Sequence, residues 1–203
     1  VEHYAALPYA ELPAFVASLQ QTADSVAARA LEFSILTATR TANVVGARWC
    51  EIDLATATWT IPAERMKKER EHRVPLSAAA LALLRSMPRL NGYVFPGTKY
   101  DRGCIAYKTL LKLCKRVRAD ITVHGFRSTF RDWAGETTAY PREVIEHALA
   151  HHLKDKAEAA YQRGDLLRKR AALMQDWADY CEGKPATYGN GIVDRSEERR
   201  VGK

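Results

Sequence analysis

One stretch of this chain carries both core and reactive side chains: His124-Gly125-Phe126-Arg127-Ser128-Thr129-Phe130-Arg131-Asp132-Trp133. Its apolar residues recur at helical spacing, and we expect a helix over residues 124–134. Phe126, Phe130 and Trp133 share the face turned toward the core. His124 and Arg127 lie three residues apart and therefore share the other face, where an imidazole and a guanidinium suit a phosphate oxygen. An ordinary surface helix, however, can also carry such a pair.

The same helical spacing extends over most of the chain. Before this stretch it predicts helices from Leu12 to Gln20, from Ala27 to Thr37 and from Thr41 to about Arg48, and a further helix that Ser77 caps. Around and after it, the candidate helices cover residues 104–118, 124–134, 141–150, 154–163 and 165–182. The last has an apolar stripe of Leu167, Ala171, Met174, Ala178 and Cys181. We expect this stripe to pack on the chain's own core, with docking on a neighbouring protomer as the alternative.

A small sheet interrupts the helices. Thr58 to Ile61 and His72 to Leu76 are rich in β-branched and aromatic residues and predict an antiparallel pair joined by a charged turn. Tyr93 to Phe95 predicts a further short strand. The expected fold class is therefore mainly α with a small antiparallel β-sheet.

The bulk composition narrows the class of protein. A chain of 203 residues with 47% apolar and 27% charged residues fits a soluble globular protein with one substantial core. It contains no apolar run long enough to span a membrane. The four cysteines are far apart, which favours a reducing cytoplasm over a disulfide framework. A net charge of +7 favours a polyanionic partner, nucleic acid first.

Four further residues suit phosphoryl transfer, and each has a more ordinary interpretation. Arg40 follows a buried helix, where an arginine commonly stabilises the helix end. Lys67 lies in the charged turn; it is either solubilising or a mobile general acid. His151 follows the segment Leu149-Ala150. Tyr161 is a poor nucleophile unless cations and a base surround it, and a single tyrosine is usually a half-buried helix residue.

A cluster of histidines near residue 150 raises the further possibility of a metal-dependent hydrolase. His147, His151 and His152 suggest a metal site, since His147 and His151 are one helical turn apart. No metalloprotease-type motif accompanies them, and the nearest carboxylates, Glu143 and Glu146, form no recognised ligand set. We therefore expect no metal and no other cofactor.

Taken together and in order, the motifs of this chain resemble the catalytic domain of the tyrosine recombinases, specifically the phage and genomic-island integrases. The motifs are Ala38-Thr39-Arg40, Gly46-Ala47-Arg48-Trp49, Met66-Lys67, Glu71 to Ser77, His124-Gly125-Phe126-Arg127, Leu149-Ala150-His151 and Ala159-Ala160-Tyr161. The likeness runs from about residue 4 to 183.

The resemblance implies a role for each catalytic residue. Arg40 and Arg127 would grip the nonbridging oxygens of the scissile phosphate, and His151 would hydrogen-bond it. Lys67, or its neighbour Lys68, would protonate the departing 5′ oxygen.

The two remaining roles belong to the attacking side of the phosphate. His124 would move a proton near the nucleophile. Tyr161 would attack to form a 3′-phosphotyrosine link.

The resemblance also implies partners and a location. The implied activity is site-specific DNA integration, that is, strand cleavage and rejoining without metal or ATP. Its substrate is double-stranded DNA at attachment sites, bound by a tetramer of protomers with accessory DNA-bending or directionality proteins. No membrane is involved, and the protein would work in a bacterial cytoplasm, on the nucleoid. A catalytically decayed, DNA-binding relic of an integrase is the alternative.

One residue departs from the family pattern, and the two ends of the chain bear on its domain organisation. Asn43 stands where the family often has an acidic residue, and we expect lower stability rather than lost chemistry from it. We expect residues 1–184 to form the catalytic domain, with the family's N-terminal DNA-binding domains absent from this fragment. Residues 185–203 are expected to be a disordered, non-native extension derived from sequencing.

Overall fold

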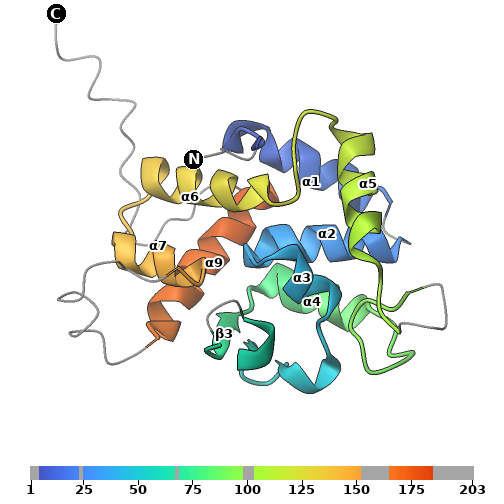
Figure 1. The fold of residues 1–203 in the computed structure, drawn as a ribbon. Helices are drawn as coiled ribbons and strands as arrows, with labels where there is room; N and C mark the ends of the chain where they lie inside the picture. Colours follow the sequence, from blue (N-terminus) through green and yellow to red (C-terminus); the bar gives the residue numbers. More distant parts are fainter. Residues whose placement is uncertain (1–4, 23–24, 67–68, 98–102, 152–164, 185–203) are drawn as a thin grey trace, which may run out of the picture.

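A computed structural model describes residues 5–22, 25–66, 69–97, 103–151 and 165–184 of the chain. It is mainly helical with one three-stranded antiparallel sheet, which confirms the predicted fold class. In Figure 1, α2 runs through the middle of the molecule, with α1 and α6 on one side and α3, α4 and the sheet on the other. Among the described residues, no helix is both long enough and apolar enough to cross a membrane.

The central helix, α2 (Val26–Thr37), packs against α1, α3, α4, α5 and α9. Its apolar residues are buried all round, as a core helix requires. Ser25 caps its start by accepting a hydrogen bond from the amide of Ala28 at 3.4 Å. The helix ends at Ala38, whose φ of 49° is left-handed. The predicted end of this helix at Thr37 is confirmed, and Arg40 lies beyond it as the N-cap residue of α3 (Thr41–Val45).

Three further helices follow the predicted pattern; the first has the predicted ends, and the third starts later than predicted. They are α1 (Leu12–Gln20), α4 (Ala78–Ser86) and α5 (Tyr107–Val117). The predicted helix to about Arg48 ends at Val45, since Arg48 has an extended backbone and pairs with Tyr93 in an isolated bridge. The predicted start of α5 at residue 104 was wrong, since Cys104 pairs with Pro96 in an isolated antiparallel bridge.

The sheet contains β1 (Ile52–Asp53), β2 (Thr58–Ile61) and β3 (His72–Pro75) in that order. Trp59 pairs with Val74, and both are buried. The predicted strand at Tyr93 to Phe95 is only an isolated bridge between Tyr93 and Arg48. Val94 and Phe95 have the burial of a strand, but Pro96 has no amide hydrogen to continue the ladder.

After α5, the described residues form the helices α6 (Gly125–Thr137), α7 (Arg142–Ala148) and α9 (Leu167–Cys181). The core-facing residues of α9 are Arg170, Leu173, Met174, Trp177, Ala178 and Cys181, whereas the predicted stripe residue Ala171 is exposed. This face contacts α7, α2, α4, α1 and β3 of the same chain. The expected packing of α9 on its own core is confirmed. The predicted helix over 154–163 and the tail 185–203 lie outside the described residues.

Candidate functional site

Four of the predicted site residues converge from three separate segments. Arg40 precedes α3, His124 and Arg127 begin α6, and His151 follows α7. A shallow hollow lies among these segments, lined by Thr39, Arg40, Asn43, Met66, His72, Arg127, Ala148, Leu149 and Ala150. Cations from distant parts of the chain thus meet at one concave surface.

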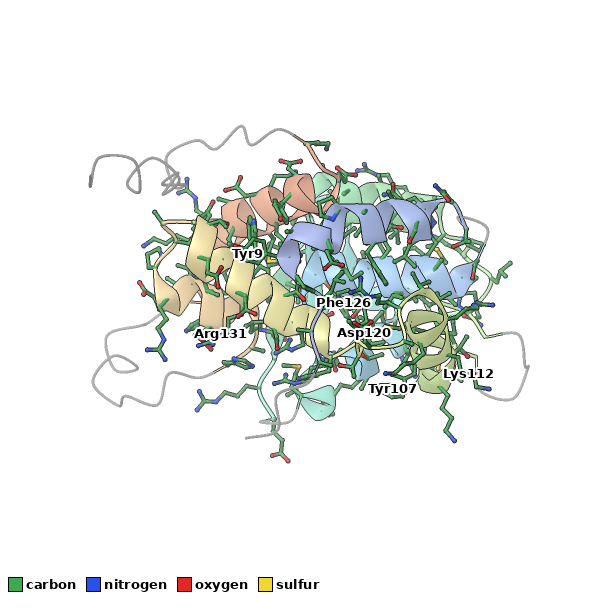
Figure 2. All side chains as sticks on the ribbon, turned by 90° about the horizontal axis from the view of Figure 1, so that it is seen from above. Tyr9, Tyr107, Lys112, Asp120, Phe126 and Arg131 are labelled. Carbon is green, nitrogen blue, oxygen red and sulfur yellow. The ribbon has the colours of Figure 1, made fainter. Side chains whose placement is uncertain are left out.

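Close packing against the N-terminal segment fixes the start of α6. A Cβ atom at Gly125 would lie 2.3 Å from the carbonyl oxygen of Ala5, so only glycine fits there. Phe126 packs on Phe15 with a ring-centroid distance of 5.0 Å. Figure 2 shows Phe126 pointing into the interior, while Arg131 lies farther along α6, beside α7. With Phe126 in the core, Arg127 lines the hollow, and His124 lies close enough to Arg127 and Arg40 for their charges to act on it.

Arg127 is a structural residue as well as a site residue. Its side chain is buried, and Nη1 donates to the carbonyl oxygen of Ala38 at 2.6 Å. Nη2 donates to the carbonyl oxygen of Leu149 at 2.7 Å and also lies 3.2 Å from Nε2 of His151. Burial and the charge of Arg40 lower the pKa of Arg127, so the two guanidiniums together concentrate positive charge at the hollow.

His151 is held between this guanidinium and a carboxylate. Its Nδ1 lies 2.8 Å from Oε2 of Glu146, and its amide donates to the Glu146 carbonyl oxygen at 2.9 Å. Arg131 occupies the other carboxylate oxygen at 2.9 Å. Burial and the charges of Arg127 and Arg40 lower the pKa of His151, and the hydrogen bond to Glu146 opposes them. Arg131 therefore supports the carboxylate rather than lining the hollow.

His124 lies within the same cluster of charges. Burial lowers its pKa most, followed by the charges of Arg127, Arg40 and His151. An imidazole with a lowered pKa is neutral near pH 7 and can accept a proton. This is the protonation state that a general base needs.

His72 lines the hollow, although the sequence assigned it no role. It is the first residue of β3 and pairs with Ile61. Burial lowers its pKa to about 3, with further contributions from Arg170, Arg127 and Arg40, against a hydrogen bond to the backbone of Ala148. Strand alternation was the available signal, because His72 lies two residues from buried Val74 and so shares its inner face.

Lys67, Lys68 and Tyr161 lie outside the described residues. Met66, which precedes the lysines, lines the hollow. Asp165, the first described residue after Tyr161, pairs with Arg73 of β3 at 2.8 Å. The chain therefore reaches the neighbourhood of the site immediately before the lysines and returns to β3 four residues after the tyrosine.

The histidine pair considered for a metal does not lie on one helix face. α7 ends at Ala148, and Ala150 has a φ of 51°, so the backbone turns before His151. Within the described ranges, no group of three or more His, Cys, Asp or Glu side chains is placed to hold a metal ion.

The arrangement of helices and sheet is similar to that of two solved structures. The integrase from mycobacterium phage Brujita superposes with a TM-score of 0.57 at 20% identity, covering 84% of this chain and 55% of that one. The XerH site-specific recombinase bound to difH substrate, in a pre-cleavage complex, gives a TM-score of 0.57 at 18% identity over 79% of this chain and 54% of that one. The fold is that of the integrases and site-specific recombinases.

Sequence relatives point the same way. Prophage integrase IntZ of Escherichia coli K12 is 38% identical over 195 residues, which cover 94% of this chain and 48% of that protein. The integrase of Enterobacteria phage P4 is 31% identical over 99% of this chain and 51% of that protein. The chain thus spans about half the length of the curated relatives it matches. Residues 6–165 match the model of the phage integrase family, and the chain belongs to that family. The predicted resemblance is confirmed.

Proposed function

We propose that this chain is the catalytic domain of a site-specific DNA integrase that cleaves and rejoins DNA strands through a covalent phosphotyrosine. The observation that carries the proposal is the contact between Arg127 and His151, 3.2 Å apart, with Arg40 lining the same hollow. A phosphodiester attacked in line gathers negative charge on its nonbridging oxygens, and fixed cations stabilise that charge. The hollow offers such cations within a small space.

The proposed reaction is a transfer of the phosphoryl group from one oxygen to another. The phenolic oxygen of Tyr161 forms a bond to phosphorus while the bond from phosphorus to the 5′ oxygen breaks. His124 accepts the tyrosine proton, and Lys67 gives a proton to the departing 5′ oxygen. Arg40, Arg127 and His151 bind the nonbridging oxygens. The lowered pKa of His124 supports its part as the base.

The energy of the broken ester is kept in the 3′-phosphotyrosine. A free 5′ hydroxyl of another strand can therefore attack the phosphorus and reverse the step, so the proposed mechanism uses neither ATP nor a metal. Activity that a chelator leaves unchanged is the expected result. Activity abolished by the chelator and restored by a metal would contradict the mechanism.

The proposed substrate is double-stranded DNA at attachment sites, bound by a tetramer of protomers with accessory DNA-bending or directionality proteins. The net charge of +7 supports a polyanionic partner, as does the fold similarity to XerH, which has been solved bound to a difH substrate. Work on DNA would place the protein at the nucleoid, in the bacterial cytoplasm.

The experiment that tests this function is covalent capture on nicked DNA. Purified protein is incubated with a pool of nicked duplexes of random sequence, and adducts that survive denaturation are isolated and sequenced. Tyr161→Phe should abolish the adduct and leave DNA binding intact. Tyr107→Phe, an exposed tyrosine on α5, should form the adduct at the wild-type level. DNA binding without any wild-type adduct would instead identify a decayed relic.

A further inference from the structure

The hydrogen bonds around His151 define its tautomer. A guanidinium nitrogen only donates, so Nε2 of His151, 3.2 Å from Nη2 of Arg127, must be the acceptor in this contact. The proton of the neutral ring is then on Nδ1, which donates to Oε2 of Glu146 at 2.8 Å. His151 is therefore neutral here, and the lone pair on its Nε2 accepts a hydrogen bond from Arg127.

This arrangement cannot persist when a phosphate occupies the hollow. Both hydrogens of Arg127 Nη2 are already engaged, one with the Leu149 carbonyl oxygen and one with His151. A phosphate oxygen that takes the second hydrogen leaves the Nε2 lone pair facing an anion. Two acceptors repel, whereas a proton on Nε2 would convert the contact into a charge-assisted hydrogen bond.

The carboxylate of Glu146 is suited to stabilise that proton. Its side chain is only 11% exposed, and its Oε2 already accepts from Nδ1. Burial opposes ionisation of Glu146, but the hydrogen bonds from Arg131 and His151 outweigh it and hold the pKa below its usual value. An ionised partner on Nδ1 favours the doubly protonated ring. The alternative tautomer, with a proton only on Nε2, would put two acceptors against each other at Glu146.

We infer that Glu146 is a positioning residue for His151: it holds Nε2 toward the phosphate position and makes phosphate binding accompany uptake of one proton by the ring. The inference rests on the proposed function only for the placement of phosphate between Arg127 and His151. Glu146 does not contact the substrate. It acts through the imidazole of His151. Arg131 pairs with the other carboxylate oxygen of Glu146 and so weakens the effect of the carboxylate on the imidazole.

The other charged groups that face His151 favour its neutral form in the absence of an anion. Arg127 on α6 and Arg40 before α3 lower the pKa of the ring, and His124 at the start of α6 would add to them once it is protonated. A bound anion offsets these charges, and the effect of Glu146 then dominates. The affinity for an anion should therefore rise as the pH falls through the range between the free and bound pKa values of His151, by up to about tenfold per pH unit.

The test is an NMR titration of the imidazole nitrogens in the full 203-residue chain. Sulfate serves as the anion because its charge does not change between about pH 5 and 8, and His151→Gln assigns the signals. In wild type, the free ring should carry its proton on Nδ1, and saturating sulfate should raise the His151 pKa by at least about one unit. A proton on Nε2 in the free protein, or a pKa that sulfate leaves unchanged, would overturn the inference.

Two substitutions around the carboxylate should act in opposite directions. Glu146→Gln should lower the His151 protonation constant about tenfold and remove most of the sulfate effect. Arg131→Gln should raise that constant, because the carboxylate loses its other cation. Glu143→Gln, one turn earlier on α7, is the matched control and should change neither. A purely structural role for Glu146 would not produce opposite shifts, and equal titration of all three variants would refute the positioning role.

These measurements are separate from the test of the proposed function. They contain no covalent step, and Tyr161 takes no part in them. Should Glu146→Gln fail to fold, the wild-type tautomer and the Arg131→Gln shift still decide the inference. If sulfate raises the His151 pKa as expected but no covalent adduct forms, the proposed function is refuted and the positioning role of Glu146 is not.

Discussion

Nη1 of Arg170 on α9 donates to the carbonyl oxygen of Arg73 on β3 at 2.6 Å, and the arginine side chain is 1% exposed. Its Nε also donates to the carbonyl oxygen of Asp165 at 2.7 Å. The Asp165 carboxylate lies 3.3 Å from Arg170 Nη2 and 2.8 Å from Arg73 Nη2. Burial lowers the pKa of Arg170, and Asp165 opposes that shift. The start of α9 is thereby joined to the strand that borders the hollow.

Replacing Arg170 by alanine should destabilise the protein substantially. Two carbonyl oxygens lose a charged donor and a cavity opens, which together cost about 3 kcal/mol. For a domain of this size, that corresponds to a melting temperature lower by roughly 6–12 °C. Thermal unfolding followed by circular dichroism measures the change. Lys169→Ala, on the exposed side of the same helix, should shift melting by less than about 2 °C; an Arg170→Ala shift that small would contradict the structural role.

The sequence predicted most of the fold because its helices have strong apolar periodicity. α1 begins and ends where the pattern placed it. The errors occur where a residue looks apolar but a neighbour decides the backbone. Val94 and Phe95 are as buried as strand residues, yet Pro96 prevents a ladder. Arg170 is charged, yet it is buried because its side chain hydrogen-bonds backbone carbonyl oxygens. A pattern based on apolar residues therefore placed Ala171, which is exposed, in the core stripe instead.

The sequence selects the residues of the candidate site, but it does not predict their geometry. Arg40, His124, Arg127 and His151 are selected by motif. Arg40 and Arg127 line one hollow, His151 contacts Arg127, and His124 lies close enough for their charges to act on it. The supporting residues escaped notice for a physical reason. Glu146 acts only through contacts that tertiary folding creates, so no local spacing identifies it. For His72, strand alternation indicates the inner face but not the neighbours that it meets there. The roles of Lys67 and Tyr161 stay predictions.

Stability should decrease toward acid pH because of His72. Its folded pKa is about 3 against an ordinary value of 6.5, so below 6.5 the unfolded state binds a proton that the folded state does not. The free energy of unfolding is then lost as pH falls from 6.5 toward 3, by at most about 1.4 kcal/mol per pH unit from this group.

Urea denaturation of wild type and His72→Gln at several pH values tests this dependence. Glutamine can still donate to the Ala148 carbonyl oxygen but binds no proton. Between pH 6 and 4 the variant should lose stability less steeply, by up to about 1.4 kcal/mol per pH unit. Near pH 7.5, where His72 is neutral in both the folded and the unfolded state, the difference in unfolding free energy between wild type and His72→Gln should no longer change with pH. Parallel slopes for the two proteins below pH 6 would rule out a buried neutral His72.

Lysine substitutions should separate the two arginines of the hollow. Arg127 holds the carbonyl oxygens of Ala38 and Leu149 with different nitrogens, whereas a lysine has a single ammonium group. Arg127→Lys should therefore cost about 2–3 kcal/mol of stability. Within the described part of the chain, the Arg40 guanidinium supports no backbone carbonyl, and Arg40→Lys should cost less than about 1 kcal/mol.

Both lysine variants should nevertheless reduce covalent adduct formation by at least about a hundredfold, since each removes a donor to the developing charge. Thermal unfolding and the adduct assay, run on the same preparations, give the two quantities. Equal losses of stability in Arg40→Lys and Arg127→Lys would show that the carbonyl contacts of Arg127 do not matter for folding.

Restoring an acidic residue at position 43 should raise stability more than activity. Asn43 is buried beside Arg40 at the hollow, and its Nδ2 lies 3.4 Å from Sδ of Met66, a weak hydrogen bond. A carboxylate there would face the positive charge of Arg40 and Arg127, which an amide offsets poorly.

Asn43→Gln adds the same length as Asn43→Glu without the charge, so comparing these two variants isolates the electrostatic part from overpacking. The glutamate variant should be the more stable by about 1 kcal/mol, or roughly 2–4 °C in melting temperature, and adduct yields should agree within about threefold. Faster adduct formation by Asn43→Glu without a rise in melting temperature would mean that the acidic residue serves the chemistry directly.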